Sequence, residues 1–158
     1  MKVIFLDIDG VLNSEQFFQE HIEDLEQFPV DRECVRRLSD IVHATNAKIV
    51  LTSSWRTGWS RDPNHMEELC RKMVEILAEY HLEIFDKTDW LRNGKRGMEI
   101  RRWIHRAPEK VETLVILDDN DFHWKRYLLH KYWVQTDFSE GGLQDDHVAR
   151  AVKILMAK

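Results

Sequence analysis

The chain has 158 residues, 43% of them hydrophobic and 32% charged, and a formal net charge of −5 at pH 7. This length and composition fit one domain over residues 1–158, with enough apolar residues for a buried core. The chain has no apolar run near the ~20 residues that span a bilayer and no recognisable secretory leader, which predicts a cytoplasmic protein without a membrane segment. The acidic balance argues against a protein that coats duplex nucleic acid.

Short apolar runs predict the strands of a sheet. In chain order, the four clear runs are Lys2–Leu6, Lys48–Leu51, Leu114–Leu117 and Tyr132–Val134, and Leu82–Phe85 is a weaker fifth candidate. Each run is continuous rather than alternating, which is typical of a parallel sheet that is covered on both faces.

Stretches with apolar residues at helical spacing separate these runs. They lie at Cys34–Val42 with Asp31 as a plausible N-cap, Met66–Tyr80, Ile100–Ala107 and Val148–Leu155, and a shorter helix is expected within Phe122–His130. Strands that alternate with helices predict an α/β fold built on a doubly wound parallel sheet. In such folds the functional site lies beyond the carboxyl ends of the strands.

The first predicted strand ends in Asp7-Ile8-Asp9-Gly10. Two carboxylates so close together repel each other unless a cation lies between them. A hard divalent ion such as Mg²⁺ relieves that repulsion and also binds phosphate oxygens, while Gly10 allows a sharp turn. On these residues alone, a turn or a helix cap explains the motif equally well.

Two further strands are followed by polar side chains. Thr52 and Ser53 follow the second run and offer hydroxyl and backbone N–H groups to a phosphate. Asp118 and Asp119 follow Leu114–Leu117 and predict a metal site, although one acid there would also serve as an N-cap. Three strands that deliver such groups to one edge of a sheet form a far more specific pattern than any single motif.

Together these motifs resemble the haloacid dehalogenase (HAD) superfamily of phosphohydrolases. That superfamily has Asp-x-Asp-Gly after its first strand, a Thr or Ser after its second, then a Lys or Arg, and finally a strand with paired acids. The resemblance covers nearly the whole chain and implies the Rossmann-like HAD fold. Residues 134–143 are also similar to small members of the superfamily, some of which resemble the phosphatase domains of nucleic-acid end-repair proteins.

The resemblance implies a role for each matching residue. Asp7 would attack phosphorus and form an aspartyl-phosphate, and Asp9 would act as general acid and then as general base. Thr52 would bond a phosphoryl oxygen. Mg²⁺ would be held by Asp7, the backbone carbonyl of Asp9 and Asp119, with Asp118 contributing through water.

The resemblance also requires a cation that neutralises charge in the transition state. The candidates are Lys95 and Arg96, which precede the predicted helix that contains Ile100. Lys95 is the more usual residue type and is slightly favoured, whereas Arg96 lies nearer the start of the helix.

The expected substrate is a phosphorylated molecule, with a nucleic-acid end as one candidate. The segment from Asn13 to Val30 is short for a folded cap, and a helix and a weak strand take up most of Ser53 to Arg92. These lengths predict a minimal cap or none and a site open to large substrates. Trp55 and Arg56 follow Thr52 and are candidate substrate contacts together with Ser53 and Gly10, although tryptophans often serve only to anchor a loop. Residues 92–106 carry six Arg or Lys residues and one Glu, which predicts a positive face or simply a solvated helix.

Two alternatives stay open at this point. A phosphatase for small metabolites uses the same motifs, with loops that order into a lid. A non-catalytic binding or regulatory module would keep the fold, but it would normally lack the nucleophile or a metal-binding acid, and both are present here.

Overall fold

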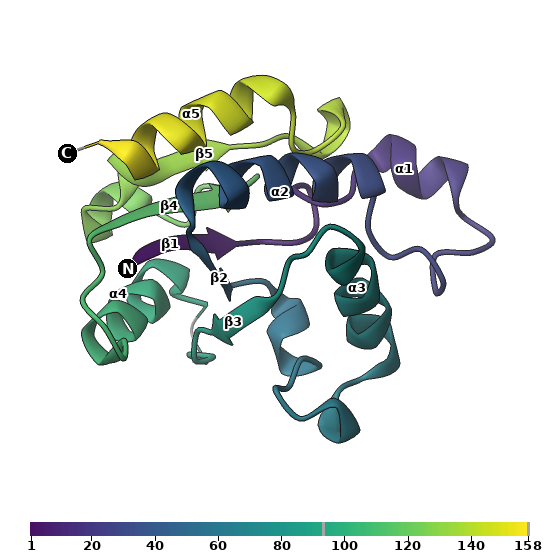
Figure 1. The fold of residues 1–158 in the computed structure, drawn as a ribbon, viewed down its shortest axis with the longest axis horizontal. Coiled ribbons are helices and arrows are strands. Elements are labelled where there is room, and N and C mark those ends of the chain that lie inside the picture. The colour runs from purple at the N-terminus through teal and green to yellow at the C-terminus, as the bar shows by residue number, and fades with distance from the viewer. Residues whose placement is uncertain (93, 158) are drawn as a thin grey trace.

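The computed structural model describes residues 1–92 and 94–157, and it contains a parallel sheet of five strands in the order β3-β2-β1-β4-β5 (Figure 1). The strands are β1 (Lys2–Leu6), β2 (Lys48–Leu51), β3 (Ile84–Lys87), β4 (Thr113–Asp118) and β5 (Trp133–Gln135). The chain winds outward from β1 in both directions, so the α/β fold with a doubly wound parallel sheet is confirmed.

Two strands begin later than the sequence predicts, because the preceding residues are used to end helices. The N–H of Leu82 donates to the carbonyl of Leu77, which closes the end of the preceding helix before β3 starts at Ile84. Tyr132 similarly completes a 3₁₀ turn before β5 begins at Trp133.

Within the described residues, five α-helices separate or follow the strands. They are α1 (Glu15–Glu20), α2 (Arg32–Thr45), α3 (Glu68–Glu79), α4 (Arg96–Arg106) and α5 (Asp145–Met156). The carboxylate of Asp31 accepts a hydrogen bond from the N–H of Glu33 at 2.9 Å, which confirms Asp31 as the N-cap of α2. The short helix expected within Phe122–His130 is a 3₁₀ turn at Trp124–Tyr127. The sequence pattern did not predict α1, which Ser14 caps through a bond from the N–H of Phe17.

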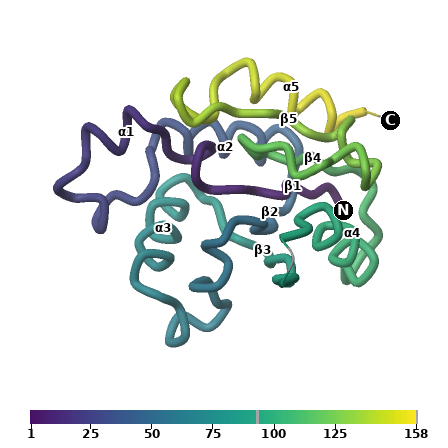
Figure 2. Tube along the Cα trace, turned by 180° about the vertical axis from the view of Figure 1, so that it is seen from behind, coloured from purple at the N-terminus to yellow at the C-terminus, as the bar shows by residue number. Residues whose placement is uncertain are grey.

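The two faces of the sheet bury two separate apolar clusters, because successive strand residues point to opposite faces. On one face Ile4, Leu6 and Leu117 pack with residues of α2, α3 and α5. On the other face Phe5 packs against Trp103 of α4, with ring centroids 5.5 Å apart. Helices therefore cover both faces, as the continuous apolar runs require (Figure 2).

The additions to this core are small. The connection from β1 to α2 carries only α1 and a turn, which project from the end of the sheet where the strands finish (Figures 1 and 2). Side chains of α3, which follows β2, belong to the main apolar cluster, so this helix is part of the core rather than of a lid. Among the described residues, no large cap is inserted.

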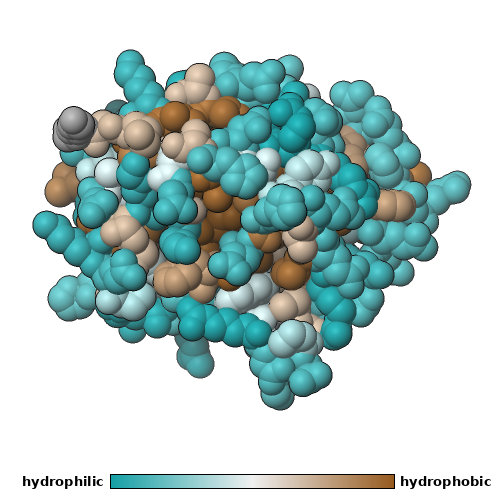
Figure 3. Space-filling view, in the orientation of Figure 1, coloured by the Kyte–Doolittle hydropathy of each residue, from teal (hydrophilic) through white to brown (hydrophobic). Residues whose placement is uncertain are grey.

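Polar residues cover most of the face seen in Figure 3, with apolar residues visible in its centre. Within the described chain, none of the helices has the length and apolar character needed to cross a membrane.

Candidate active site

The register of the sheet places the three polar strand ends side by side. Leu6 of β1 pairs with Leu51 of β2 on one side and with Leu117 of β4 on the other. The next residues, Asp7, Thr52 and Asp118, therefore come together at one edge of the sheet. Their arrangement follows from parallel pairing, because every strand ends at the same edge.

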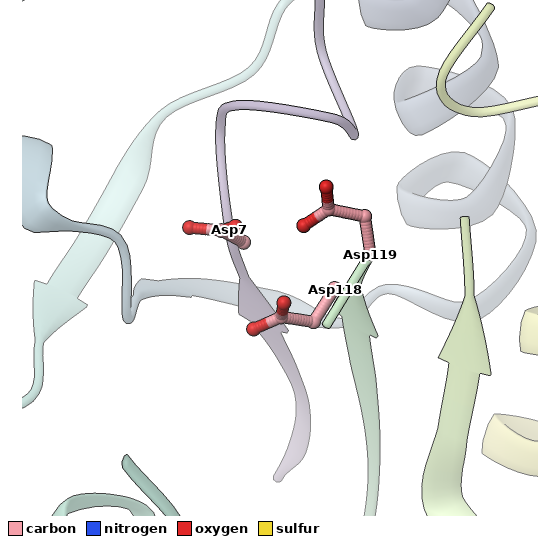
Figure 4. Close-up of side chains that lie close together, drawn as sticks. All are labelled: Asp7, Asp118 and Asp119. Carbon is pink, nitrogen blue, oxygen red and sulfur yellow. The ribbon is translucent and has the colours of Figure 1, made fainter. Parts of the chain in front are cut away.

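The carboxylates of Asp7, Asp118 and Asp119 form a compact cluster (Figure 4). One oxygen from each residue lies within 4.8 Å of the others. Asp7 and Asp118 are buried, and Asp119 is half-buried. Three acids in this arrangement can act together on one ligand.

Gly10 lets Asp119 join the cluster. Its φ is +81°, in the left-handed region that favours glycine, and a Cβ placed on it would lie 2.3 Å from Oδ2 of Asp119. The carbonyl of Gly10 accepts a hydrogen bond from the hydroxyl of Thr136 at 2.6 Å, which fixes the turn. Gly10 is thus required for the approach of the two loops, and its role as a substrate contact stays a prediction.

Arg96 is the cation that reaches the carboxylates. Its Nη1 lies 2.6 Å from Oδ2 of Asp118 and 3.2 Å from Oδ1 of Asp7. The guanidinium carbon also lies 4.0 Å from the centroid of the Phe122 ring. Lys95 is the N-cap residue of α4, and in the described part of the chain it forms no ion pair with a carboxylate. The geometry therefore favours Arg96 over Lys95 as the catalytic cation.

Burial and nearby negative charges raise the pKa values of the two buried acids. Burial, only partly offset by Arg96, raises the pKa of Asp7 to about 6. Burial and the charge of Asp7 raise the pKa of Asp118 to about 7. Burial also raises the pKa of Asp119. One arginine thus compensates three carboxylates incompletely.

This donor set fits a hard divalent cation. Three ionised carboxylates and one guanidinium leave two negative charges uncompensated at a buried site, and carboxylate oxygens are the ligands that Mg²⁺ prefers. Burial is the main cause of the raised pKa values of Asp7 and Asp118, and a bound cation would favour the ionised forms of both. The acids present therefore match a magnesium site.

The metal-free protein is expected to lose stability as pH rises from about 5 to 8. Asp7 and Asp118 have folded-state pKa values of about 6 and about 7 against an ordinary 3.8, so the folded state binds more protons than the unfolded state in this range. The stabilising contribution of these protons is complete below pH ~4 and disappears as the acids ionise. Thermal unfolding in EDTA across this range measures the effect.

Two controls accompany this measurement. The pH-dependent fall should shrink in Asp118→Asn, which cannot ionise, and it should shrink in the wild type when magnesium is added. A melting temperature that rises steadily across this range in EDTA would contradict the assignment of the raised pKa values.

Asp9 lies on the turn after β1, and two side chains hold its carboxylate. Its Oδ1 accepts from Nδ2 of Asn13 at 2.8 Å, and its Oδ2 accepts from the indole Nε1 of Trp55 at 3.2 Å. Asn13 also accepts from the N–H of Gly10 at 3.0 Å. No sequence pattern indicated Asn13 or the bond from Trp55 to Asp9. Because Trp55 positions Asp9, its replacement is expected to affect every substrate rather than nucleic acids alone.

The residues after β2 differ in what they offer to a ligand. Thr52 is fully buried and continues the sheet through its N–H, but its hydroxyl has no hydrogen-bond partner among the described residues. An orphaned buried hydroxyl beside Asp7 is consistent with a missing ligand oxygen. The hydroxyl of Ser53 instead caps the 3₁₀ turn Ser54–Thr57 by accepting from the N–H of Trp55.

Arg56 is buried and occupied by protein partners. Its Nη2 lies 2.8 Å from Oε2 of Glu99, and its Nη1 donates to the carbonyl of Thr52. The other oxygen of Glu99 accepts from the N–H of Leu91 at 2.8 Å. This ion pair links the loop after β2 to α4, close to Arg96, so Arg56 has a clear structural function and its role as a substrate contact stays a prediction. Glu99 was missed in the sequence, although a lone acid on the apolar side of a basic helix is a usable signal.

Trp90 was also missed, and it is the exposed tryptophan of this region. It is 55% exposed, and the guanidinium carbon of Arg56 lies 4.7 Å from the centroid of its ring. Trp59, in contrast, is only 5% exposed and packs in the core.

Comparison with known proteins agrees with this geometry. A family model described as the HAD domain in Swiss Army Knife RNA repair proteins matches residues 3–148. No curated protein and no solved structure gives a significant match. The matched range runs from β1 into α5 and includes all the acids of the cluster and Arg96. The chain therefore belongs to the family of HAD domains found in Swiss Army Knife RNA repair proteins, within the HAD-like phosphohydrolases.

Proposed function

We propose that this chain is a magnesium-dependent phosphomonoesterase that uses Asp7 as its nucleophile and acts on the terminal phosphate of a nucleic-acid strand. The observation that carries the proposal is the cluster of Asp7, Asp118 and Asp119 with Arg96 at the carboxyl edge of the sheet. Membership of a family of HAD domains supports the reaction class.

The proposed reaction has two steps. In the first, an oxygen of Asp7 attacks phosphorus, the bond from phosphorus to the ester oxygen breaks, and Asp9 gives its proton to the leaving oxygen. In the second, water attacks the phosphorus of the aspartyl-phosphate, the bond from phosphorus to the oxygen of Asp7 breaks, and Asp9 takes a proton from that water. Inorganic phosphate leaves and both acids return to their starting states. Asn13 and Trp55 hold the carboxylate of Asp9 in place through one hydrogen bond to each of its oxygens.

The other residues of the site would bind the transferring group. Asp7, Asp118 and Asp119, with the backbone carbonyl of Asp9, would hold Mg²⁺. When bound, the ion would neutralise charge on the phosphoryl oxygens and on the carboxylates around them. The hydroxyl of Thr52 would donate to a phosphoryl oxygen, and Arg96 would stabilise the charge that develops there.

Three observations support a nucleic-acid end as the substrate. The family is described by its occurrence in RNA repair proteins. The exposed ring of Trp90 lies beside Arg56, and Arg56 bonds the carbonyl of Thr52. Arg56 therefore connects an exposed aromatic ring to the end of β2, where the phosphate would bind. Aromatic rings of this kind stack nucleobases. The small connection between β1 and α2 also leaves room for a polymer.

The test is phosphate release from an aryl phosphate, a nucleoside monophosphate and RNA oligonucleotides with a 3′- or 5′-phosphate. Each is measured with magnesium and with EDTA. We expect release to require magnesium, and kcat/KM to be highest for one of the oligonucleotides. Highest kcat/KM on the mononucleotide would favour a small-metabolite phosphatase. No release from any substrate, with magnesium bound, would contradict the proposed activity.

A further inference from the structure

A groove beside α4 differs in charge from the rest of the molecule. It has a volume of about 600 Å³ and is lined by Arg101, Lys125, Leu128, His130, Lys131 and Tyr132, which we call the basic groove. Four of these side chains are basic and none is acidic, although the whole chain has a net charge of −5.

The basic side chains of the groove have no acidic partners. Elsewhere, arginines such as Arg32, Arg37 and Arg56 pair with carboxylates at 2.8–3.0 Å. Within the described residues, no carboxylate lies within 4.0 Å of a basic atom of the groove. Arg101 is instead fixed by backbone carbonyls: it donates to Tyr127 at 2.6 and 2.8 Å and to Leu128 at 3.1 Å. Bonds to neutral carbonyls leave its charge available to an outside anion.

The groove also presents one exposed aliphatic side chain, Leu128, and one aromatic ring, Tyr132. Leu128 is 77% exposed and has a φ of 57°, a backbone conformation that is uncommon for leucine. Lys131 lies over the ring of Tyr132, with Nζ 4.9 Å from the centroid. Cations that alternate with an aromatic ring and an exposed aliphatic side chain match single-stranded nucleic acid, which offers phosphates and unstacked bases together.

Helix α4 contributes residues to both the groove and the proposed active site. Arg96, at the first turn, contacts Asp7 and Asp118, while Arg101 lies five residues further, a rise of roughly 7.5 Å along the helix. Gly97 holds the helix tightly against this segment, since a Cβ on it would lie 2.2 Å from the ring of Tyr127.

We infer that the basic groove binds the single-stranded segment of the nucleic acid whose terminal phosphate is bound at Asp7. This inference rests on the proposed function and adds the path of the substrate. Arg101, Lys125 and Lys131 contact phosphates, and Tyr132 and Leu128 contact bases. The groove binds the chain of the nucleic acid and takes no part in the reaction. A small substrate such as an aryl phosphate therefore gains no affinity from it.

The test compares two double variants with the same change of net charge. Lys125→Glu/Lys131→Glu reverses two charges of the groove. Lys48→Glu/Lys153→Glu reverses two exposed lysines on β2 and α5 that have no carboxylate partner within the described chain. Each protein is assayed on an aryl phosphate and on a phosphorylated RNA of about ten nucleotides over a range of salt. Binding of the same RNA without its phosphate is measured by fluorescence anisotropy.

The groove variant is expected to lose at least about tenfold in RNA affinity, with a log–log salt slope shallower by at least about 1.4, since each contact with a single strand contributes ~0.7. Its kcat/KM for phosphorylated RNA should fall in parallel, whereas its activity on the aryl phosphate should change less than about twofold. The RNA affinity of the control variant and its kcat/KM for phosphorylated RNA should also change less than about twofold. Equal losses of RNA affinity in both double variants would show that the affinity depends on the net charge of the protein rather than on the groove, and would overturn the inference.

Two further outcomes separate this inference from the proposed function. If wild type cleaves the aryl phosphate but neither cleaves nor binds RNA, the nucleic-acid substrate and the groove both fail, while the phosphatase chemistry stands. If wild type cleaves phosphorylated RNA and the groove variant does so equally well, only the groove inference fails. Binding of polyglutamate as tight as that of RNA would show a groove for acidic polypeptides and would also overturn it.

Discussion

Replacing Asp7 by Asn is expected to reduce phosphate release by roughly 10⁴-fold or more, because the variant keeps the shape of the side chain but loses the nucleophile. The same change removes one ligand of the proposed magnesium site, so the apparent affinity for magnesium should fall as well. Acid-quenched wild type should carry one added phosphoryl group by intact mass after reaction with substrate, and the variant should carry none.

The fold should survive this substitution. Asp7 is buried and its pKa is raised to about 6, so the ionised side chain destabilises the metal-free protein at neutral pH and an amide does not. We therefore expect an equal or higher melting temperature for Asp7→Asn in EDTA at pH 8. Asp146→Asn on α5, an exposed acid outside the site, is the matched control for loss of one negative charge. Turnover that persists in Asp7→Asn would exclude the covalent mechanism.

Replacing Arg96 by Met is expected to lower kcat/KM by about 10²–10³-fold, whereas Lys95→Met should change it less than about threefold. Arg96 is the side chain that contacts both buried carboxylates, and removal of one such charge-stabilising donor costs this much in other enzymes. The two variants are ideal controls for each other, since adjacent residues lose the same charge. A larger loss in Lys95→Met would reverse the assignment and restore the preference that the sequence alone indicated.

Arg96→Met should also change stability in a pH-dependent way. Without the guanidinium, Asp118 is fully buried beside Asp7 with no cation. Removing one member of a buried pair costs about 3–5 kcal/mol when the remaining group is charged. The loss should therefore be larger at pH 8 than at pH 5, where Asp118 is protonated, and magnesium should restore part of it. A loss of stability that does not vary with pH would mean that Arg96 acts mainly through packing.

Glu99 explains why the position of Arg96 is well defined. The pair Arg56–Glu99 is almost completely buried and joins the loop after β2 to the first turn of α4. Because Arg56 also bonds the carbonyl of Thr52, one network connects the end of β2 to the helix that carries Arg96. Such buried pairs specify one arrangement more than they add net stability.

The sequence by itself determined the sheet and the positions of its polar ends. Continuous apolar runs are buried on both faces, so they identified the strands and the parallel topology without knowledge of any contact. Parallel strands end at one edge, so Asp7, Thr52 and Asp118 had to come together once the order of elements was known. The HAD family followed from the same motifs, and the match over residues 3–148 agrees with it.

Only the tertiary structure decided which neighbouring side chains face the site. Lys95 and Arg96 differ by one position, but one residue turns a helix by ~100°, and the place where α4 begins sends Arg96 to the carboxylates. Likewise, Trp55 bonds Asp9 while Trp90, far along the chain, is exposed beside Arg56. Local patterns fix periodicity and burial, whereas the direction of a polar side chain depends on partners that are distant in sequence, and these exist only in the folded chain.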